Sequence, residues 1–112
     1  MLLIPFFIPS PHKGANDMTE ESVPEIAQLR CQIDEIDLGL LQLLNTRAEA
    51  VLKIQAIKRE LGLPAYSPKR EDEIIEQVRN ANTGPMSAEA VEAVFRMILL
   101  CARAWWGYGS VK

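Results

Sequence analysis

An apolar stripe runs through the middle of this sequence, and its length is the strongest constraint on the fold. Arg47 interrupts the stripe at a position where the pattern requires an apolar side chain. A guanidinium on a buried helix face costs several kcal/mol unless an anion meets it, so Arg47 predicts a buried anion-binding site. The stripe advances by alternating steps of three and four residues, typical of one face of a single helix about 60 Å long. Its members are Ile26, Leu29, Ile33, Ile36, Leu40, Leu43, Ala50, Ile54, Ile57 and Leu61.

Local signals mark the ends of this long helix and the start of a second one. Ser22-Val-Pro-Glu25 is a capping-box pattern that predicts the start of the long helix. Gly62, followed by Pro64, predicts its end. Ser67 and Pro68 suit the N-cap and first residue of a second helix, over residues 68–80. Its residues expected to face inward are Ile74, Ile75 and Val78.

A third helix is predicted after the turn-forming residues 82–85. Ser87 is its expected N-cap, and the helix should end at Trp105 and Trp106 because Gly107 and Gly109 follow. Apolar residues repeat along it at helical spacing: Val91, Phe95, Ile98, Leu99 and Ala102. No stretch has the alternation of a strand.

The sequence therefore predicts an all-α fold with one long, one short and one medium helix. A helix of about 40 residues cannot bury its whole stripe on two shorter partners, so we expect a second copy to cover the rest. The result would be an intertwined six-helix homodimer whose pockets draw residues from both chains. Within the 112 residues we predict a disordered N-terminal extension over 1–21, one domain over 22–107 and a short tail over 108–112.

Charge and composition exclude several classes of function. The net charge is −3 with no basic block, which argues against nucleic-acid binding. The two cysteines, Cys31 and Cys101, and the single His12 are too few for a zinc site or a disulfide framework. We expect both cysteines to be reduced and in or near the core.

Nothing in the sequence predicts insertion into a membrane. No apolar run reaches the ~18 residues of a membrane-spanning helix. Residues 1–9, MLLIPFFIP, resemble a short signal segment, but no basic residue precedes the apolar run, two prolines interrupt it and no small-residue cleavage site follows. A cytoplasmic location is therefore expected.

Four cationic positions on the first two helices suggest one binding pocket. Arg47 and Lys58 are 11 residues apart, so they share a helix face to within about 20°. Arg30 is rotated by roughly 100° from Arg47 and should point to a different neighbour, such as a partner chain. Arg70-Glu71 lies in the first turn of the second helix.

Each of these cations, taken alone, could be an ordinary solvated side chain, and Arg30 could form an ion pair with Asp34, one helical turn further along. Together they indicate a polycationic pocket with a single carboxylate, suited to a small polyanion. The sequence contains no nucleophile–base set and no glycine-rich phosphate loop. A catalyst built this way would act by positioning and electrostatics.

These residues resemble the all-helical chorismate mutases, chorismate mutase type II, over about residues 22–106. The matching motifs are Leu29-Arg30-x-x-Ile33-Asp34-x-x-Asp37, Leu43-Leu44-x-x-Arg47, Ile57-Lys58 and Tyr66-Ser-Pro-Lys-Arg70-Glu71. The resemblance implies a homodimer with two buried sites and the rearrangement of chorismate to prephenate for aromatic amino-acid biosynthesis. This enzyme would be an isomerase, an intramolecular transferase, that needs no cofactor.

The resemblance also implies a role for each polar residue. Arg47 and Arg30 of the partner chain would grip the two carboxylates of the substrate. Lys58 would bond the ether oxygen, where negative charge develops, and Glu71 with Arg70 would hold the ring hydroxyl. We therefore expect Arg47, Lys58 and Glu71 to be the catalytic residues.

Three substrate-binding positions depart from the family pattern. Ser67 stands where the family often has Asp, and Ala102 and Trp106 stand on the third helix where it usually has a small polar residue and Gln or Glu. Two alternatives therefore stay open. One is the sister activity of the same fold, an isochorismate pyruvate-lyase that forms salicylate. The other is a weakly active or non-catalytic module that requires a partner enzyme of the shikimate pathway.

Overall fold

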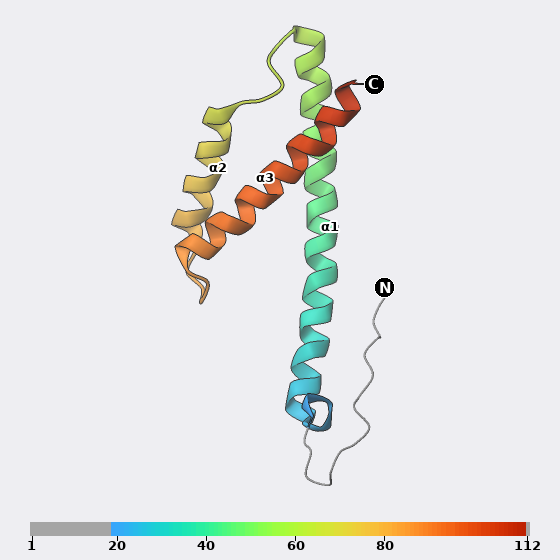
Figure 1. The fold of residues 1–112 in the computed structure, drawn as a ribbon, viewed down its shortest axis with the longest axis vertical. Coiled ribbons are helices and arrows are strands. Elements are labelled where there is room, and N and C mark those ends of the chain that lie inside the picture. The colour runs from blue at the N-terminus through green and yellow to red at the C-terminus, as the bar shows by residue number, and fades with distance from the viewer. Residues whose placement is uncertain (1–18, 112) are drawn as a thin grey trace. The chain divides into compact units, whose positions relative to one another are not determined.

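The computed structural model describes residues 19–111, with side chains at 19, 20 and 22–104. A short 3₁₀ turn, Glu20–Ser22, precedes three α-helices: α1 (Pro24–Leu61), α2 (Pro68–Ala81) and α3 (Ala88–Val111) (Figure 1). The described residues contain no strand, and the prediction of three helices in an all-α chain is confirmed. They fall into two compact units that divide after Gln42, so α1 contributes its first half to one unit and its second half to the other. The predicted extension lies mostly outside the described residues.

The start of α1 differs from the predicted capping box. Ser22 lies in the 3₁₀ turn, where its hydroxyl donates to the Thr19 carbonyl at 2.8 Å instead of capping the helix. The reason is Pro24, because a proline forces the residue before it into extended backbone, and Val23 has φ −106° and ψ 109°. The carbonyl of Val23 accepts the first bonds of the helix, from the amides of Ile26 and Ala27. The N-cap is therefore Val23 and not Ser22, and the helix begins one residue later than predicted.

The end of α1 is as predicted. Gly62 adopts φ 71°, a left-handed conformation that strains any residue with a side chain. The amide of Leu63 then folds back and donates to the Lys58 carbonyl at 2.8 Å. This Schellman-type closure turns the chain toward the loop that leads to α2.

Serine caps begin both shorter helices, as predicted. The Ser67 hydroxyl accepts from the Arg70 amide at 3.2 Å, and the Ser87 hydroxyl accepts from the Ala90 amide at 3.0 Å. The predicted end of α3 is wrong, because the helix continues through both glycines to Val111. A glycine costs a helix only about 1 kcal/mol relative to alanine, so two of them do not stop a helix whose earlier turns are well formed.

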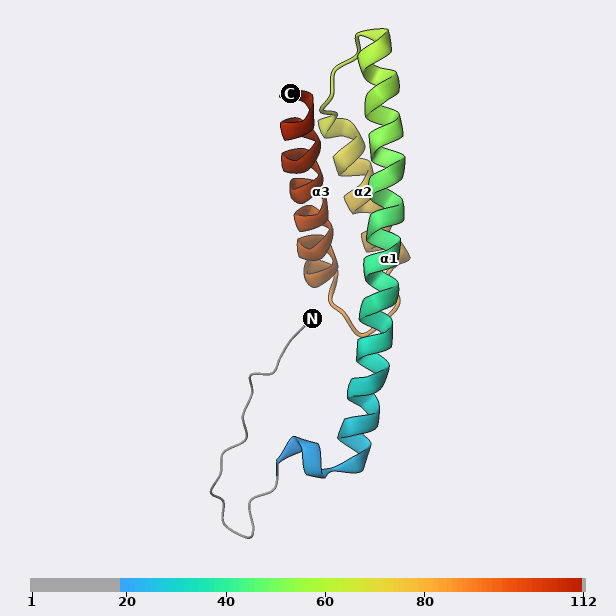
Figure 2. The ribbon, with the colours of Figure 1, turned by 90° about the vertical axis from the view of Figure 1, so that its right-hand side faces the viewer.

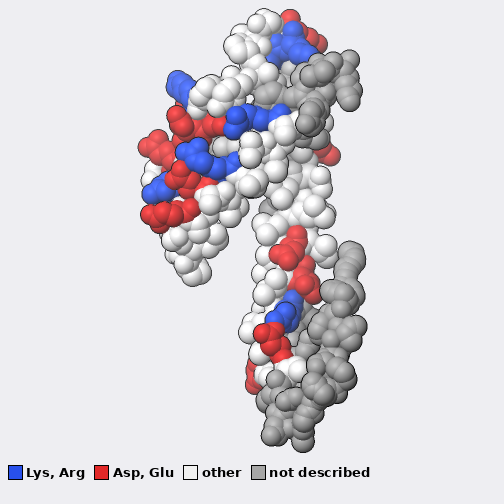
Figure 3. Space-filling model, in the orientation of Figure 1, with Lys and Arg blue, Asp and Glu red and all other residues white. Residues whose placement is uncertain are grey.

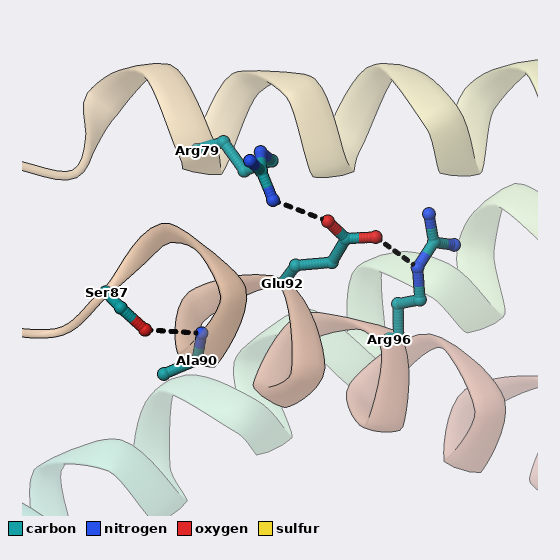
Figure 4. Close-up of polar contacts among 5 residues, drawn as sticks. All are labelled: Arg79, Ser87, Ala90, Glu92 and Arg96. Atoms are coloured by element: carbon teal, nitrogen blue, oxygen red, sulfur yellow. Dashed lines mark hydrogen bonds and ion pairs between the residues drawn. The ribbon is translucent and has the colours of Figure 1, made fainter.

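The described core lies between α2 and α3, which pack against each other as a hairpin of helices (Figures 1 and 2). Among the described side chains, only three apolar ones are buried, with 5% to 8% of their surface exposed: Ile75 of α2, and Val91 and Leu99 of α3. Glu92 joins the two helices by accepting from Arg79 of α2 at 2.7 Å, and within α3 it also accepts from Arg96 at 2.8 Å (Figure 4). The bond from Arg79 fixes the register of α3 along α2.

Glu92 should make the stability of this hairpin depend on pH. The bond from Arg96, and then that from Arg79, hold the pKa of Glu92 below its ordinary value of 4.5. A carboxylate with a lowered folded-state pKa stabilises the fold above its unfolded pKa and loses that effect as pH falls through the folded value. We expect Glu92→Gln to unfold at a lower temperature than the native chain at pH 7. The difference should shrink below about pH 4 in thermal unfolding followed by circular dichroism. An equal difference at both pH values would contradict this role.

Most apolar side chains of α1 remain exposed within the single chain. Along the apolar stripe Ile26 is half-buried, and from Leu29 onward the exposed fraction of the large residues lies between 50% at Ile54 and 68% at Leu43. Charged side chains gather over α2 and α3, whereas a stretch in the middle of α1 carries no charge in this view (Figure 3). The prediction that the cysteines lie in or near the core is wrong, since Cys31 and Cys101 are both free and exposed. In the described part of the chain, no helix is both long and apolar enough to cross a membrane.

Candidate active site

A cavity of about 250 Å³ lies in the second unit, where four segments meet. The segments are the second half of α1, the loop before α2, the first turns of α2 and the second half of α3. The structure brings together here most of the residues predicted from the sequence: Arg47, Lys58, Ser67, Arg70, Glu71 and Ala102. A space of this size suits a small metabolite and is too small for a dinucleotide.

The wall formed by α1 is held to the loop by two side chains. Lys58 Nζ donates to the Ala65 carbonyl at 3.1 Å, and Gln55 Nε2 donates to the same carbonyl at 3.2 Å. Gln55 is buried, with 7% of its surface exposed, and its amide therefore needs this partner. The two bonds fix the loop across the end of α1 and place the Lys58 ammonium at the cavity.

The N-cap of α2 positions the wall of the cavity that this helix forms. The Ser67 hydroxyl is engaged by the Arg70 amide, so the serine that replaces the expected aspartate keeps the capping function. The Arg70 side chain is exposed and lies 3.5 Å from Glu73. That contact is an exposed ion pair of little energy, and Arg70 can leave it for a ligand.

The wall formed by α3 contains a cation that the sequence analysis did not select, Arg103. Its Nε lies 3.2 Å from Glu71 Oε2, and its guanidinium carbon lies 4.8 Å from the centroid of the Tyr66 ring. The Glu71 side chain is only 15% exposed and that of Arg103 is 38% exposed, so the ion pair is partly buried. The Nε–H is not aligned for a hydrogen bond and is a buried donor without an acceptor among the described residues.

The signal for Arg103 was present in the sequence. Arg103 follows the inward-facing Phe95 and Leu99 by eight and four residues, and therefore lies on the inward face of the third helix. A charge on an apolar helix face is the feature that singled out Arg47. Gln55 and Tyr66 also line the cavity, but their spacing gave no comparable signal.

Two predicted residues are not brought to this cavity by the described structure. Arg30 lies in the first unit, where it forms an ion pair with Glu20 instead of the Asp34 considered from the sequence. The side chain of Trp106 lies outside the described residues. Ala102 lines the cavity with a methyl group alone, so it supplies no polar contact.

The charge of the cavity defines what it can bind. Arg47, Lys58, Arg70 and Arg103 face a single carboxylate, that of Glu71. Within the described residues, Arg47 and Lys58 have no carboxylate partner, so their charge is available to an anion. No group of three or more potential metal ligands occurs in the part of the chain that the structure describes. Fixed charges arranged in this way can bind a small anion and stabilise negative charge that develops on it.

Comparison with known proteins identifies the family. Residues 29–104 match the model of chorismate mutase type II, and this chain belongs to that family. The chorismate mutase structure from Thermus thermophilus (Form I) superposes with a TM-score of 0.68 at 35% identity, over 70% of this chain and 98% of that one.

Curated relatives agree with this assignment. The bifunctional chorismate mutase/prephenate dehydratase of Aquifex aeolicus is 38% identical over 79 residues, which are 67% of this chain and 22% of that protein. The chorismate mutase of Methanocaldococcus jannaschii is 35% identical over 57 residues, 51% of this chain and 58% of that protein. The chain spans about a fifth of the length of the longer relatives, including two T-proteins.

Proposed function

We propose that this protein catalyses the rearrangement of chorismate to prephenate in aromatic amino-acid biosynthesis. The observation that carries the proposal is the convergence of Arg47, Lys58 and Glu71 on one small cavity in a chain of the chorismate mutase type II family. The names of its relatives from Aquifex aeolicus and Methanocaldococcus jannaschii support the same activity.

The reaction suits a site of fixed charges. In one concerted step the bond between the ring carbon and the ether oxygen breaks while a carbon–carbon bond forms within the same molecule. No proton is transferred and no electron donor is needed, so the protein must hold the substrate in a chair-like conformer and stabilise the charge on the departing oxygen. In our proposal Arg47 grips a carboxylate and Lys58 donates to the ether oxygen.

Product analysis tests this proposal. Purified protein should consume chorismate and form prephenate, which acid converts to phenylpyruvate. The assay should be repeated with the first synthase of the shikimate pathway added, because the third helix lacks a polar group at Ala102. Salicylate and pyruvate from isochorismate would instead establish the lyase. No turnover of chorismate in either assay would overturn the proposal.

We further propose that the active form is a homodimer. The apolar stripe of α1 is about half exposed along its length, and a soluble chain rarely leaves so long an apolar face uncovered. A second, apolar hollow of about 490 Å³ borders the cavity between α1 and α3, and shares Arg47, Val51 and Ala102 with it. A second copy could cover both surfaces and bring Arg30 to the cavity of its partner.

Charge placed on the stripe should separate the copies. Leu40 lies on the stripe, whereas Leu38, which is also exposed, lies on another face of α1, so Leu40→Glu and Leu38→Glu form a matched pair of variants. Light scattering after gel filtration should give a dimer for the native chain and for Leu38→Glu, and a monomer with at least tenfold lower activity for Leu40→Glu. A native chain of monomer mass with full activity would rule out the dimer.

A further inference from the structure

Arg103 differs from the other cations of the cavity because its carboxylate partner, Glu71, also lines the cavity. Its guanidinium is held on one side by Glu71, at 3.2 Å, and on its face by the Tyr66 ring, at 4.8 Å. Arg47 and Lys58 have no such carboxylate among the described residues. The cavity therefore contains two kinds of surface: a cationic one on α1, and a charge-compensated pair formed by α2 and α3.

An arginine that is already paired with a carboxylate binds a different kind of ligand group from an unpaired cation. A carboxylate placed there would meet Glu71 as well as Arg103, and its attraction to one would be opposed by its repulsion from the other. A hydroxyl group suits both members, because it donates one hydrogen bond and accepts another. Glu71 can accept from such a group and a guanidinium N–H can donate to it.

The guanidinium is also accessible from the cavity. Its Nε is buried beside Glu71, but 38% of the Arg103 side chain is exposed, so the terminal N–H groups are the donors that a ligand could reach. Contact with the Tyr66 ring restrains the plane of the guanidinium, so its orientation is set before a ligand arrives. The neighbouring Ala102 offers no competing polar atom.

We propose that Arg103 and Glu71 together recognise the ring hydroxyl of the substrate, with Arg103 as a specificity-determining residue supplied by α3. The inference rests on the proposed function, since chorismate bears one hydroxyl on its ring. Arg103 thus supplies from α3 the polar contact that Ala102 lacks, one residue further along the helix.

The test compares two substrates across matched variants. We would measure kcat/KM for chorismate and for its analogue without the ring hydroxyl, with the native protein, Arg103→Met and Arg103→Lys. Arg103→Met should lose about 10- to 100-fold on chorismate, the effect of a hydrogen bond to a charged group, and less than about threefold on the analogue. Arg103→Lys should recover part of the loss on chorismate. A similar loss on both substrates would overturn the proposal, because it would indicate a structural role.

Arg96→Met is the control, because Arg96 is also an arginine of α3 paired with a glutamate but does not line the cavity. Arg96→Met should leave kcat/KM unchanged for both chorismate and the analogue. If Arg103→Met does not fold, the native protein alone decides, since equal kcat/KM for chorismate and the analogue would refute the recognition of the hydroxyl. Absence of turnover by the native protein would refute the proposed function separately. Dissociation constants for the same two compounds, measured by calorimetry, would then test the inference.

Discussion

Replacing Lys58 by methionine should lower kcat for chorismate by about 10²- to 10³-fold and change KM much less. Methionine keeps much of the apolar stem of lysine but removes the ammonium, which lies at the cavity 3.1 Å from the Ala65 carbonyl. The charge on the ether oxygen grows only as its bond to carbon breaks. An ammonium at that oxygen therefore stabilises the transition state more than the bound substrate, and its loss appears in kcat.

Lys53→Met is the matched control for this variant. Lys53 is an exposed lysine of the same helix that does not line the cavity. It should retain native kcat. A Lys58→Met variant with native kcat, or one in which only KM rises, would show that Lys58 binds the substrate without acting on the bond that breaks.

Replacing Arg47 by alanine should reduce kcat/KM for chorismate by about 10³-fold or more, because a buried carboxylate that loses its cation costs roughly 3–5 kcal/mol. The unliganded variant should nevertheless unfold at the same temperature as the native chain or at a higher one. Arg47 is half-buried on the apolar stripe and has no carboxylate partner among the described residues, so its removal relieves an unfavourable charge. Steady-state kinetics and thermal unfolding of the same preparation measure both effects.

The control for Arg47 is Arg59→Ala, which removes an exposed arginine of α1 outside the cavity. It should leave activity unchanged. Native turnover by Arg47→Ala would place the active site elsewhere. A lower unfolding temperature would instead show that Arg47 has a stabilising role in the unliganded fold.

Much of the fold could be predicted because its signals are local. Helix caps at Ser67 and Ser87 and the left-handed Gly62 involve residues within four positions of each other, and all three form as predicted. The failures arise where two local signals compete. At the start of α1 the constraint from Pro24 prevails over the capping box of Ser22, and at the end of α3 two glycines do not outweigh the helix that precedes them.

The site could be predicted only in part, for a related reason. Arg47 and Lys58 lie on one helix, so their spacing alone places them on one face. The pairing of Arg103 with Glu71 joins residues 32 positions apart and depends on how α3 packs on α2, which no local pattern contains. The roles of all these residues toward the substrate remain predictions.

The bonds at Ala65 have a consequence for the speed of the reaction. A free lysine side chain samples many rotamers, and restricting it costs up to about 2 kcal/mol in conformational entropy. Here Lys58 is already restrained by the Ala65 carbonyl, which also accepts a hydrogen bond from Gln55. Much of that entropy is therefore lost when the chain folds and not when the ligand binds. Ammonium has three N–H donors, so one bond to the loop leaves two that can point to an arriving oxygen.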